Sequence, residues 1–305
     1  MNQKTAITGA AWALLFLLAL IWGGSFLAIR TALDEIPFLT SVAWRVGIAA
    51  ALLWLVVAVR GDAIPREPRI WGALLVMGIL NNVIPFTFMA WGQLFIPTGL
   101  TAILNATTAV FGVIVAAAIL PDERLTRRRI AGVSLGFAGV VLVIGPGLLG
   151  GLDPASLGQI AVIAGTLSYA FAGVWARLRL SNLTPLVAAA GMLTGSSLIV
   201  IPLALVMDGP PEVALAPVTW AAIGYYAAIA TAFAYLLYYR ILALAGSGNL
   251  LLVTLMIPPV AIVLGAVVRG EVLSVMAFAG FAVLALGLAI LDGRILALFK
   301  TAPAR

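Results

Sequence analysis

The sequence contains no cysteine and no histidine, and charged residues make up only 9% of its 305 positions. Without cysteine there are no disulfides, and the redox compartment is left open. Without histidine the chain lacks the commonest metal ligand and the commonest general base. A soluble domain carries about 25% charged residues. The composition is therefore not that of an ordinary soluble enzyme.

Hydrophobic residues are abundant and make up 64% of the chain. Apolar runs of about 20 residues, long enough to cross a bilayer as a helix, fill nearly its whole length. The runs are apolar all round, whereas the strands of a membrane barrel alternate apolar and polar residues. The first run, from about Ala10 to Ile29, is longer than the apolar part of a signal peptide, so we interpret it as a retained span. The predicted fold class is an all-α membrane protein.

Ten transmembrane helices are predicted, joined by short connections that often contain proline or glycine. None of the connections is long enough to hold a soluble domain. The predicted spans are 10–30, 38–59, 70–91, 97–119, 128–146, 157–177, 185–206, 219–240, 247–268 and 275–294.

The basic residues predict an orientation, because loops rich in lysine and arginine stay in the cytoplasm. With the N-terminus in the cytoplasm, fourteen basic residues fall on that side and only Arg30 and Arg269 fall outside. The remaining one, Arg45, lies within a span. This distribution supports ten spans and places both termini in the cytoplasm. It also accounts for the net charge of +6 without a nucleic-acid partner.

One stretch of the sequence has an echo about 148 residues later. Asn105–Arg124 and Thr254–Glu271 are both apolar, open with polar or proline residues and end near a glutamate, Glu123 or Glu271. We therefore predict two repeats of five spans each, residues 1–148 and 149–305. Because five is odd, the second repeat enters the membrane inverted. Inverted repeats are common in secondary transporters, where the substrate site lies at their interface near the midplane.

The Trp22–Phe26 segment, WGGSF, and the doubled helix ending in glutamate and followed by a glycine-rich helix resemble the drug/metabolite transporter superfamily. The resemblance is to its EamA-type ten-helix members, and it covers about residues 10–145 and 157–293. It implies metabolite efflux across a bacterial inner membrane. It also implies a central cavity lined by the first, third, fourth, sixth, eighth and ninth spans.

Polar residues within the spans are candidates for substrate contact, because they are costly in a bilayer. Asn82 and Phe86 share one face of the third span. Asn105 and Thr108 open the apolar helix of the first repeat, and Thr254 and Pro258 stand in the corresponding place of the second. Prolines within a span free backbone groups that can meet a polar substrate. The alternatives are an amide bridging two helices and a simple packing bend.

Aromatic residues form a second set of candidates. Trp22 lies in the first span, Tyr169 in the sixth, and Tyr235 and Tyr239 in the eighth. Stacking and hydroxyl contacts from such residues suit an amino acid with an apolar or aromatic side chain. The alternative interpretation, an interfacial anchor, fits tryptophans near span ends better.

Arg45 is the only charged residue within a predicted span. We interpret it as reaching to the outer interface or pairing with Asp34 or Glu35, and the alternative is an anchor for a substrate carboxylate. No carboxylate lies deep in a span, which favours a facilitator or a coupling route that the sequence does not reveal. Glu123 and Glu271 are expected to cap or pair locally with nearby arginines, Arg269 in the case of Glu271. Glycines such as Gly132, Gly139, Gly280 and Gly287 let helices approach closely, so we interpret the fifth and tenth spans as packing or dimer elements and not as the pathway.

The sequence thus favours an exporter of small metabolites, amino acids above all, that works by alternating access. The alternatives are a carrier of drugs or other metabolites in the same superfamily, or a membrane scaffold without transport. An enzyme is disfavoured because no base or nucleophile pair is visible. No cofactor or metal is expected. The expected partners are the small-molecule substrate and the lipid bilayer, and the chain is expected to be a monomer or a homodimer.

Overall fold

The structure is a computed structural model that describes residues 9–123, 125–144, 153–250 and 252–292. Helices account for nearly all of these residues, and no strand occurs among them. The elements in chain order are α1 (Gly9–Ala32), α2 (Phe38–Arg60), α3 (Pro68–Gly78), η1 (Ile79–Val83), α4 (Ile84–Gly92), α5 (Thr98–Asn105), α6 (Thr108–Ile119), α7 (Arg127–Ile144), α8 (Pro154–Arg179), α9 (Pro185–Met207), α10 (Pro217–Gly224), η3 (Tyr225–Phe233), α11 (Ala234–Leu250), α12 (Val253–Arg269) and α13 (Val275–Asp292).

The predicted all-helical membrane fold is confirmed at this level. In the described ranges, seven continuous helical stretches are long and apolar enough to cross a bilayer, and two shorter apolar helices follow. The seven are Gly9–Ala32, Phe38–Arg60, Pro68–Gly92, Thr98–Ile119, Pro154–Arg179, Pro185–Met207 and Pro217–Leu244, and the shorter two are Val253–Arg269 and Val275–Leu291. The predicted fifth span corresponds to α7. Ten crossings thus remain a prediction.

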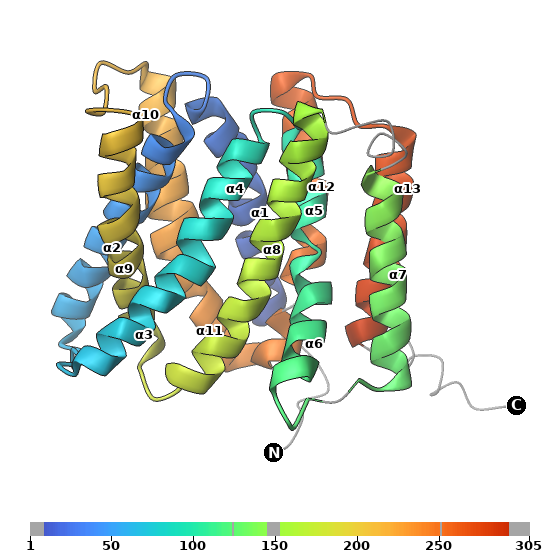
Figure 1. Cartoon of the computed structure of the whole chain (residues 1–305), viewed down its shortest axis with the longest axis horizontal. Helices are drawn as coiled ribbons and strands as arrows, with labels where there is room; N and C mark the ends of the chain where they lie inside the picture. Colours follow the sequence, from blue (N-terminus) through green and yellow to red (C-terminus); the bar gives the residue numbers. More distant parts are fainter. Residues whose placement is uncertain (1–8, 124, 145–152, 251, 293–305) are drawn as a thin grey trace, which may run out of the picture.

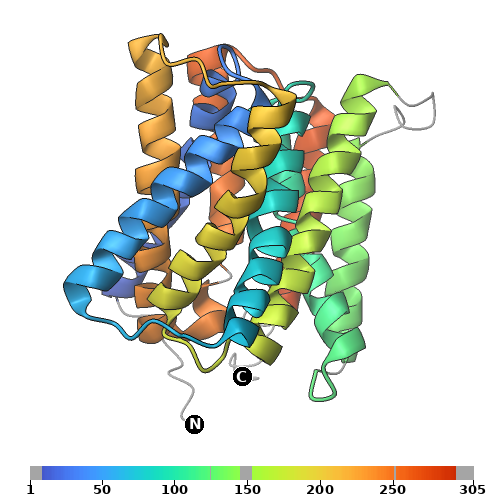
Figure 2. The same ribbon diagram turned by 60° about the vertical axis from the view of Figure 1, so that its left-hand side comes forward.

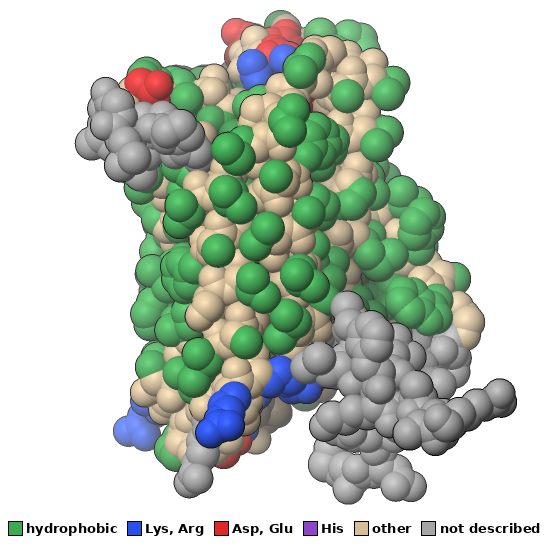
Figure 3. Space-filling model, turned by 90° about the vertical axis from the view of Figure 1, so that its right-hand side faces the viewer, with side chains coloured by type: hydrophobic (Ala, Val, Ile, Leu, Met, Phe, Trp, Pro, Cys, Tyr) green, Lys and Arg blue, Asp and Glu red, His purple; other side chains and the backbone are tan. Residues whose placement is uncertain are grey.

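The surface has the pattern of a bilayer-spanning protein. Hydrophobic side chains cover the middle of the face in Figure 3, and charged side chains gather at its two ends. Large apolar side chains such as Leu55, Val141 and Val206 are 61%, 66% and 80% exposed. A lipid environment accounts for so much exposed apolar surface, because soluble monomers rarely expose large apolar patches.

The helices form a bundle with two distinct edges. At one edge α2 and α9 pack side by side, and at the other α7 pairs with α13 (Figures 1 and 2). Small residues bring the second pair together: a Cβ added to Gly139 would lie 2.5 Å from the Leu284 nitrogen. One added to Gly287 would lie 2.6 Å from the Gly136 nitrogen. The glycines therefore have the packing role predicted for them.

The start of α5 lies against the end of α12, so these two helices run antiparallel (Figure 1). Glu271, just after α12, accepts hydrogen bonds from the Thr98 backbone N–H at 2.9 Å and from the Thr98 hydroxyl at 2.6 Å. The carboxylate thereby caps the free N–H groups at the start of α5. Glu271 is a cap, as expected, but on another helix. Of the two expectations for Glu271, the cap is therefore the one found, and Arg269 forms its ion pair with Asp34.

Two of the long helices contain a wider π-helical segment. η1 precedes Pro85, which has no N–H for the carbonyl four residues earlier and whose ring crowds that turn. In η3 the Thr231 hydroxyl donates to the Tyr226 carbonyl at 2.7 Å, which satisfies a backbone oxygen in the widened turn. Both segments leave carbonyl oxygens available to side chains of neighbouring helices.

Two predicted helix boundaries are wrong. Asn105 does not open a helix: it ends α5, and α6 begins at Thr108. The hydroxyls of Thr107 and Thr108 bond the carbonyls of Leu104 and Asn105 across this break, so threonines compete there with the helical ladder. The ninth helix begins at Val253 and not near 247, because α11 continues to Leu250.

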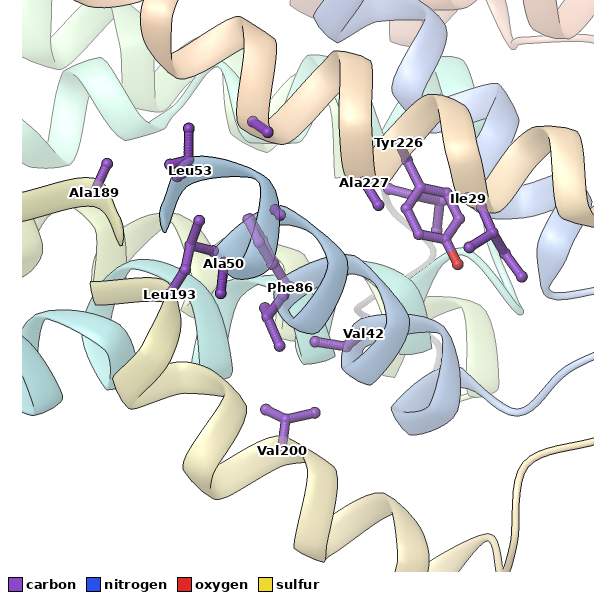
Figure 4. Close-up of a cluster of buried hydrophobic side chains, with 14 of the residues drawn as sticks. Ile29, Val42, Ala50, Leu53, Phe86, Ala189, Leu193, Val200, Tyr226 and Ala227 are labelled. Carbon is purple, nitrogen blue, oxygen red and sulfur yellow. The ribbon is translucent and has the colours of Figure 1, made fainter. Parts of the chain in front are cut away.

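The largest buried cluster joins α2, α9, η3, α4 and the end of α1. Phe86 and Tyr226 belong to it, together with Val42, Leu193 and Val200 (Figure 4). Tyr235, Tyr239 and Tyr169 pack against its margin and are only partly buried. These three tyrosines therefore flank the largest buried cluster.

Candidate functional site

A row of aromatic side chains runs from α1 to α11. We call Trp22, Tyr238, Tyr239 and Tyr235 the aromatic row. The ring centroids of Trp22 and Tyr238 are 6.0 Å apart, those of Tyr238 and Tyr239 are 5.3 Å apart, and those of Tyr239 and Tyr235 are 6.4 Å apart. All four side chains are partly accessible. Three of them, Trp22, Tyr235 and Tyr239, were predicted from the sequence to line a site.

The row ends at two amides of η1. The Asn81 amide nitrogen donates to the Tyr235 hydroxyl at 3.1 Å and to the Asn82 side-chain oxygen at 3.3 Å. Asn82 is fully buried, and its own nitrogen donates to the Ser196 hydroxyl on α9 at 2.8 Å. Of the two amides, Asn81 is partly accessible. The Tyr235 hydroxyl also donates to the Asn82 side-chain oxygen, at 3.5 Å. Asn82 thus bridges helices, which was its alternative interpretation, and Asn81 takes the more exposed position.

Arg45 of α2 points into the bundle beside this row. Its Nε donates to the Thr231 hydroxyl of η3 at 2.9 Å, and its guanidinium carbon lies 3.6 Å from the centre of the Phe86 ring. Tyr169 of α8 and Tyr235 pack against the buried cluster that contains Phe86. Arg45 therefore lies beside a cluster that brings together Phe86, Tyr169 and Tyr235, all three of them predicted site residues.

The interpretation that Arg45 pairs with an outer carboxylate is wrong. Asp34 binds Arg269 at 2.7 Å and Arg30 at 2.6 Å. Glu35 accepts from the Ala216 backbone at 3.0 Å and also from the Thr219 hydroxyl. Within the described residues, no carboxylate lies within ion-pair distance of Arg45. The reason is the rotation of α2, which turns this position toward η3 and α4.

Backbone carbonyls freed in the π-helical segments are bonded from other helices. The Ser168 hydroxyl donates to the Leu80 oxygen in η1 at 2.7 Å. The Trp22 indole N–H donates to the Ala230 oxygen in η3 at 3.1 Å. Trp22 is therefore both a member of the aromatic row and an anchor that fixes α1 against η3.

The remaining predicted site residues are Asn105, Thr108, Thr254 and Pro258. Asn105 and Thr108 flank the α5–α6 break; Thr108 bonds the Asn105 backbone, and the Asn105 side-chain oxygen is buried without a partner. Thr254 is partly accessible in the first turn of α12, and Pro258 is buried one turn later. Neither Asn105 nor Thr108 forms a hydrogen bond with the aromatic row or with the η1 amides.

Sequence reasoning missed several members of the cluster as site residues, namely Asn81, Arg45, Tyr238, Thr231 and Ser196. Asn81 is adjacent to Asn82, and a single-residue shift on a helix changes the direction of a side chain by about 100°. The π-helical widening of η1 alters that direction further. Arg45 carried a signal, an unpaired charge in a span, but its partner could only be found from the packing of α2.

Charged groups hold the helix ends together outside the cluster. Asp34 joins the end of α1 to Arg269 at the end of α12, and the hydrogen bond from Arg269 holds the pKa of Asp34 below its ordinary value of 3.8. Asp208 accepts from the Thr40 backbone and hydroxyl at the start of α2. At the opposite end, Glu123 binds Arg129 at 2.7 Å and Arg177 at 3.3 Å. The expected pairing of Glu123 with a nearby arginine is confirmed.

The sequence pattern that defines the EamA-like transporter family matches residues 9–145 and, a second time, residues 156–291. An uncharacterized transporter of Archaeoglobus fulgidus is 29% identical over 85% of this chain and 86% of its own length. A probable amino-acid metabolite efflux pump of Salmonella typhimurium is 25% identical over 90% of this chain and 92% of its own length. The uncharacterized transporter YoaV of Bacillus subtilis is 23% identical, and there the match spans only about half of each protein, 54% and 56%.

A solved crystal structure of another protein has the same fold. It superposes with a TM-score of 0.66 over 92% of this chain and 96% of that chain, at 20% identity. At this identity the similarity concerns the arrangement of helices.

Proposed function

The chain belongs to the EamA-like transporter family, and on that premise we propose that it exports small metabolites, foremost amino acids with apolar or aromatic side chains, across a bacterial inner membrane. The family and the names of the relatives indicate a multi-pass membrane transporter and not an enzyme. The relative of Salmonella typhimurium named as a probable amino-acid metabolite efflux pump supports the choice of substrate class.

The observation that carries the proposal is the aromatic row ending at Asn81. It offers ring faces for an apolar side chain and, at one end, an amide and a hydroxyl for the polar part of a small molecule. Its members come from α1 and α11, and Asn81 comes from η1, so the site is built from both halves of the chain. A site between two halves is reached alternately from the two sides when the halves rock against each other.

We propose that residues 1–148 and 149–305 are inverted five-helix repeats around this site. The double family match, residues 9–145 and 156–291, supports the division. The π-helical segments support it as well. η1 follows the short helix α3 in the second long helical stretch after α1, and η3 follows the short helix α10 in the second long stretch after α8. α5 ends where the first echoed stretch begins, and α12 contains most of the second. The antiparallel contact between these two helices agrees with inversion.

The basic residues orient the proposed transporter. Arg30 and Arg269 meet at Asp34, and Arg129 and Arg177 meet at Glu123 at the opposite helix ends. With the richer group inside, the Glu123 end faces the cytoplasm, and so do both termini. Within the described ranges the carboxylates lie in loops or at helix ends, so the proposal includes no proton-carrying carboxylate in the pathway.

Efflux from proteoliposomes tests the proposal. Vesicles containing the purified protein are loaded with labelled phenylalanine or leucine, and efflux is compared with that from protein-free vesicles. We expect faster efflux from the parent, a strong loss in Tyr235→Ala, and no loss in Trp12→Ala, a matched change at a residue that is 46% exposed on the surface. If no amino acid leaves faster than from protein-free vesicles, the substrate assignment is wrong. Efflux of a cationic drug alone would establish the alternative carrier.

A further inference from the structure

Arg45 is a cation within a membrane-spanning helix, and no carboxylate among the described residues lies within ion-pair distance of it. It lies two turns into α2, and its side chain contacts η3 and α4. The carboxylates nearest to it in sequence, Asp34 and Glu35, are held at the helix ends by other partners. Arginine does not give up its proton in proteins. An unpaired charge in a membrane interior is costly, and such charges mark functional sites.

The hydrogen bonding of Arg45 leaves its outer nitrogens free. Its Nε binds the Thr231 hydroxyl, and one face of its plane covers the Phe86 ring. In the part of the chain that the structure describes, no hydrogen bond uses Nη1 or Nη2. These two nitrogens form the fork that matches a carboxylate in a bidentate pair. Although side chains from several helices surround it, Arg45 keeps part of its surface accessible.

The surroundings of Arg45 have a polar and an apolar side. Tyr169 and Tyr235 pack against the cluster that contains Phe86, the ring under the Arg45 guanidinium, and Asn81 donates to the Tyr235 hydroxyl. From Tyr235 the aromatic row leads away to Tyr239 and on to Trp22. A ligand with a carboxylate at one end and an apolar group at the other fits this arrangement.

We propose that Arg45 binds the carboxylate of the substrate and that the ammonium group of an amino acid is not required for binding. The inference rests on the proposed function, because it concerns the same site. The Arg45 guanidinium supplies a positive charge next to Phe86, whereas no described carboxylate lies there to bind an ammonium by charge. The site therefore selects small apolar carboxylates, including amino acids, and disfavours amines without a carboxylate.

A structural role for Arg45 makes a different prediction. The bond to Thr231 and the contact with Phe86 tie α2 to η3 and α4, so loss of Arg45 as a mere tether would weaken the fold and the binding of all ligands alike. A role in carboxylate recognition affects carboxylates alone. The two roles are separated by a series of ligands that share one apolar group.

Direct binding to the purified full-length protein tests the proposal, with phenylalanine, 3-phenylpropionate and phenethylamine as probes. We expect the parent to bind both carboxylates and to bind phenethylamine far more weakly. In Arg45→Gln, binding of both carboxylates falls about ten- to a hundredfold, as expected for loss of a charged hydrogen-bonded pair. Arg45→Lys retains part of the affinity. Arg60→Gln, the same change in the exposed last turn of α2, binds like the parent.

Several results would overturn the proposal. They are equal binding of phenethylamine and phenylalanine by the parent, unchanged carboxylate binding in Arg45→Gln, and an equal loss of all ligands in that variant. If Arg45→Gln fails to fold, the comparison of ligands on the parent still tests the preference for a carboxylate, and Arg45→Lys tests its assignment to Arg45. Binding of 3-phenylpropionate without phenylalanine would reject amino acids as substrates and keep the carboxylate site. Phenylalanine efflux with equal binding of carboxylates and the amine would keep amino acids as substrates and reject the carboxylate site.

Discussion

Asn81 and Asn82 are neighbours in the sequence, yet their surroundings differ. Asn82 is completely buried and bonds Ser196, which in turn donates to the Gly78 and Met192 carbonyls. Asn81 is partly accessible and bonds the Tyr235 hydroxyl at the end of the aromatic row. Asn82 thus stabilises the contact between η1 and α9, and Asn81 is the amide that we propose contacts the substrate.

This difference predicts opposite effects of the same substitution. Asn82→Ala is expected to lower stability by about 1 kcal/mol, the usual scale of an interhelical hydrogen bond in a membrane. Asn81→Ala is expected to leave stability nearly unchanged and to slow transport severalfold. Thermal unfolding in detergent and efflux from proteoliposomes measure the two effects. If Asn82→Ala slows transport at unchanged stability, Asn82 and not Asn81 contacts the substrate.

At the scale of the element, the pair α7–α13 depends on glycines whose hydrogens touch the backbone of the partner helix. A Cβ on Gly139 would meet the Leu284 nitrogen at 2.5 Å and the Gly280 oxygen at 2.8 Å. Backbone atoms cannot turn aside as a flexible side chain can, so the two helices would have to separate. Sequence spacing indicated small residues at these positions, but not which helix they would face.

Gly139→Ala is therefore expected to destabilise the protein by about 1–3 kcal/mol through overpacking. Gly112→Ala in α6 is the matched control, because a Cβ there meets nothing within 4 Å. Thermal unfolding of both purified variants checks the prediction. Equal stability of the two variants would show that α7 and α13 do not pack as described.

For the whole molecule, the ion pairs at the helix ends join parts of the chain that are far apart in sequence. The Asp34 carboxylate links α1 to α12, and its pKa is lowered by the hydrogen bond from Arg269. Asp34 has a lowered folded-state pKa, so its contribution to stability is complete above its ordinary pKa of 3.8 and is lost as the pH falls through the lowered value. The side chain is 47% exposed, so solvent screening keeps the contribution small.

Asp34→Asn is therefore expected to lower the stability at neutral pH by at most about 1 kcal/mol. The difference from the parent should shrink in strong salt and vanish below the lowered pKa. Unfolding temperatures of parent and variant from neutral to acid pH measure it. A difference that persists unchanged in acid would mean that Asp34 stabilises the fold by some contact other than its ion pairs.

The absence of cysteine makes the proposed orientation directly testable. Val213, 64% exposed in the loop before α10, should lie outside, and Ala63, exposed in the loop before α3, should lie in the cytoplasm. In spheroplasts an impermeant maleimide is expected to label Val213→Cys at once and Ala63→Cys only after permeabilisation. The opposite labelling pattern would show that the proposed orientation in the membrane is wrong.

The sequence by itself determined the class of the protein, its apolar helices, and most of the aromatic candidates. Long apolar runs and scarce charge leave a chain few alternatives to membrane helices, because unsatisfied backbone groups are excluded from lipid. An aromatic residue within a predicted span can be identified from the sequence alone. This is how the candidates Trp22, Tyr169, Tyr235 and Tyr239 were selected.

Only the tertiary structure decided which of these residues meet and which partners they have. The inward direction of Arg45, the division of labour between Asn81 and Asn82, and the capping of α5 by Glu271 all arise between helices distant in sequence. They depend on the rotation of each helix about its axis and on the widened turns of η1 and η3. That rotation is fixed by packing against neighbours, and a linear pattern of apolar residues on all faces does not encode it.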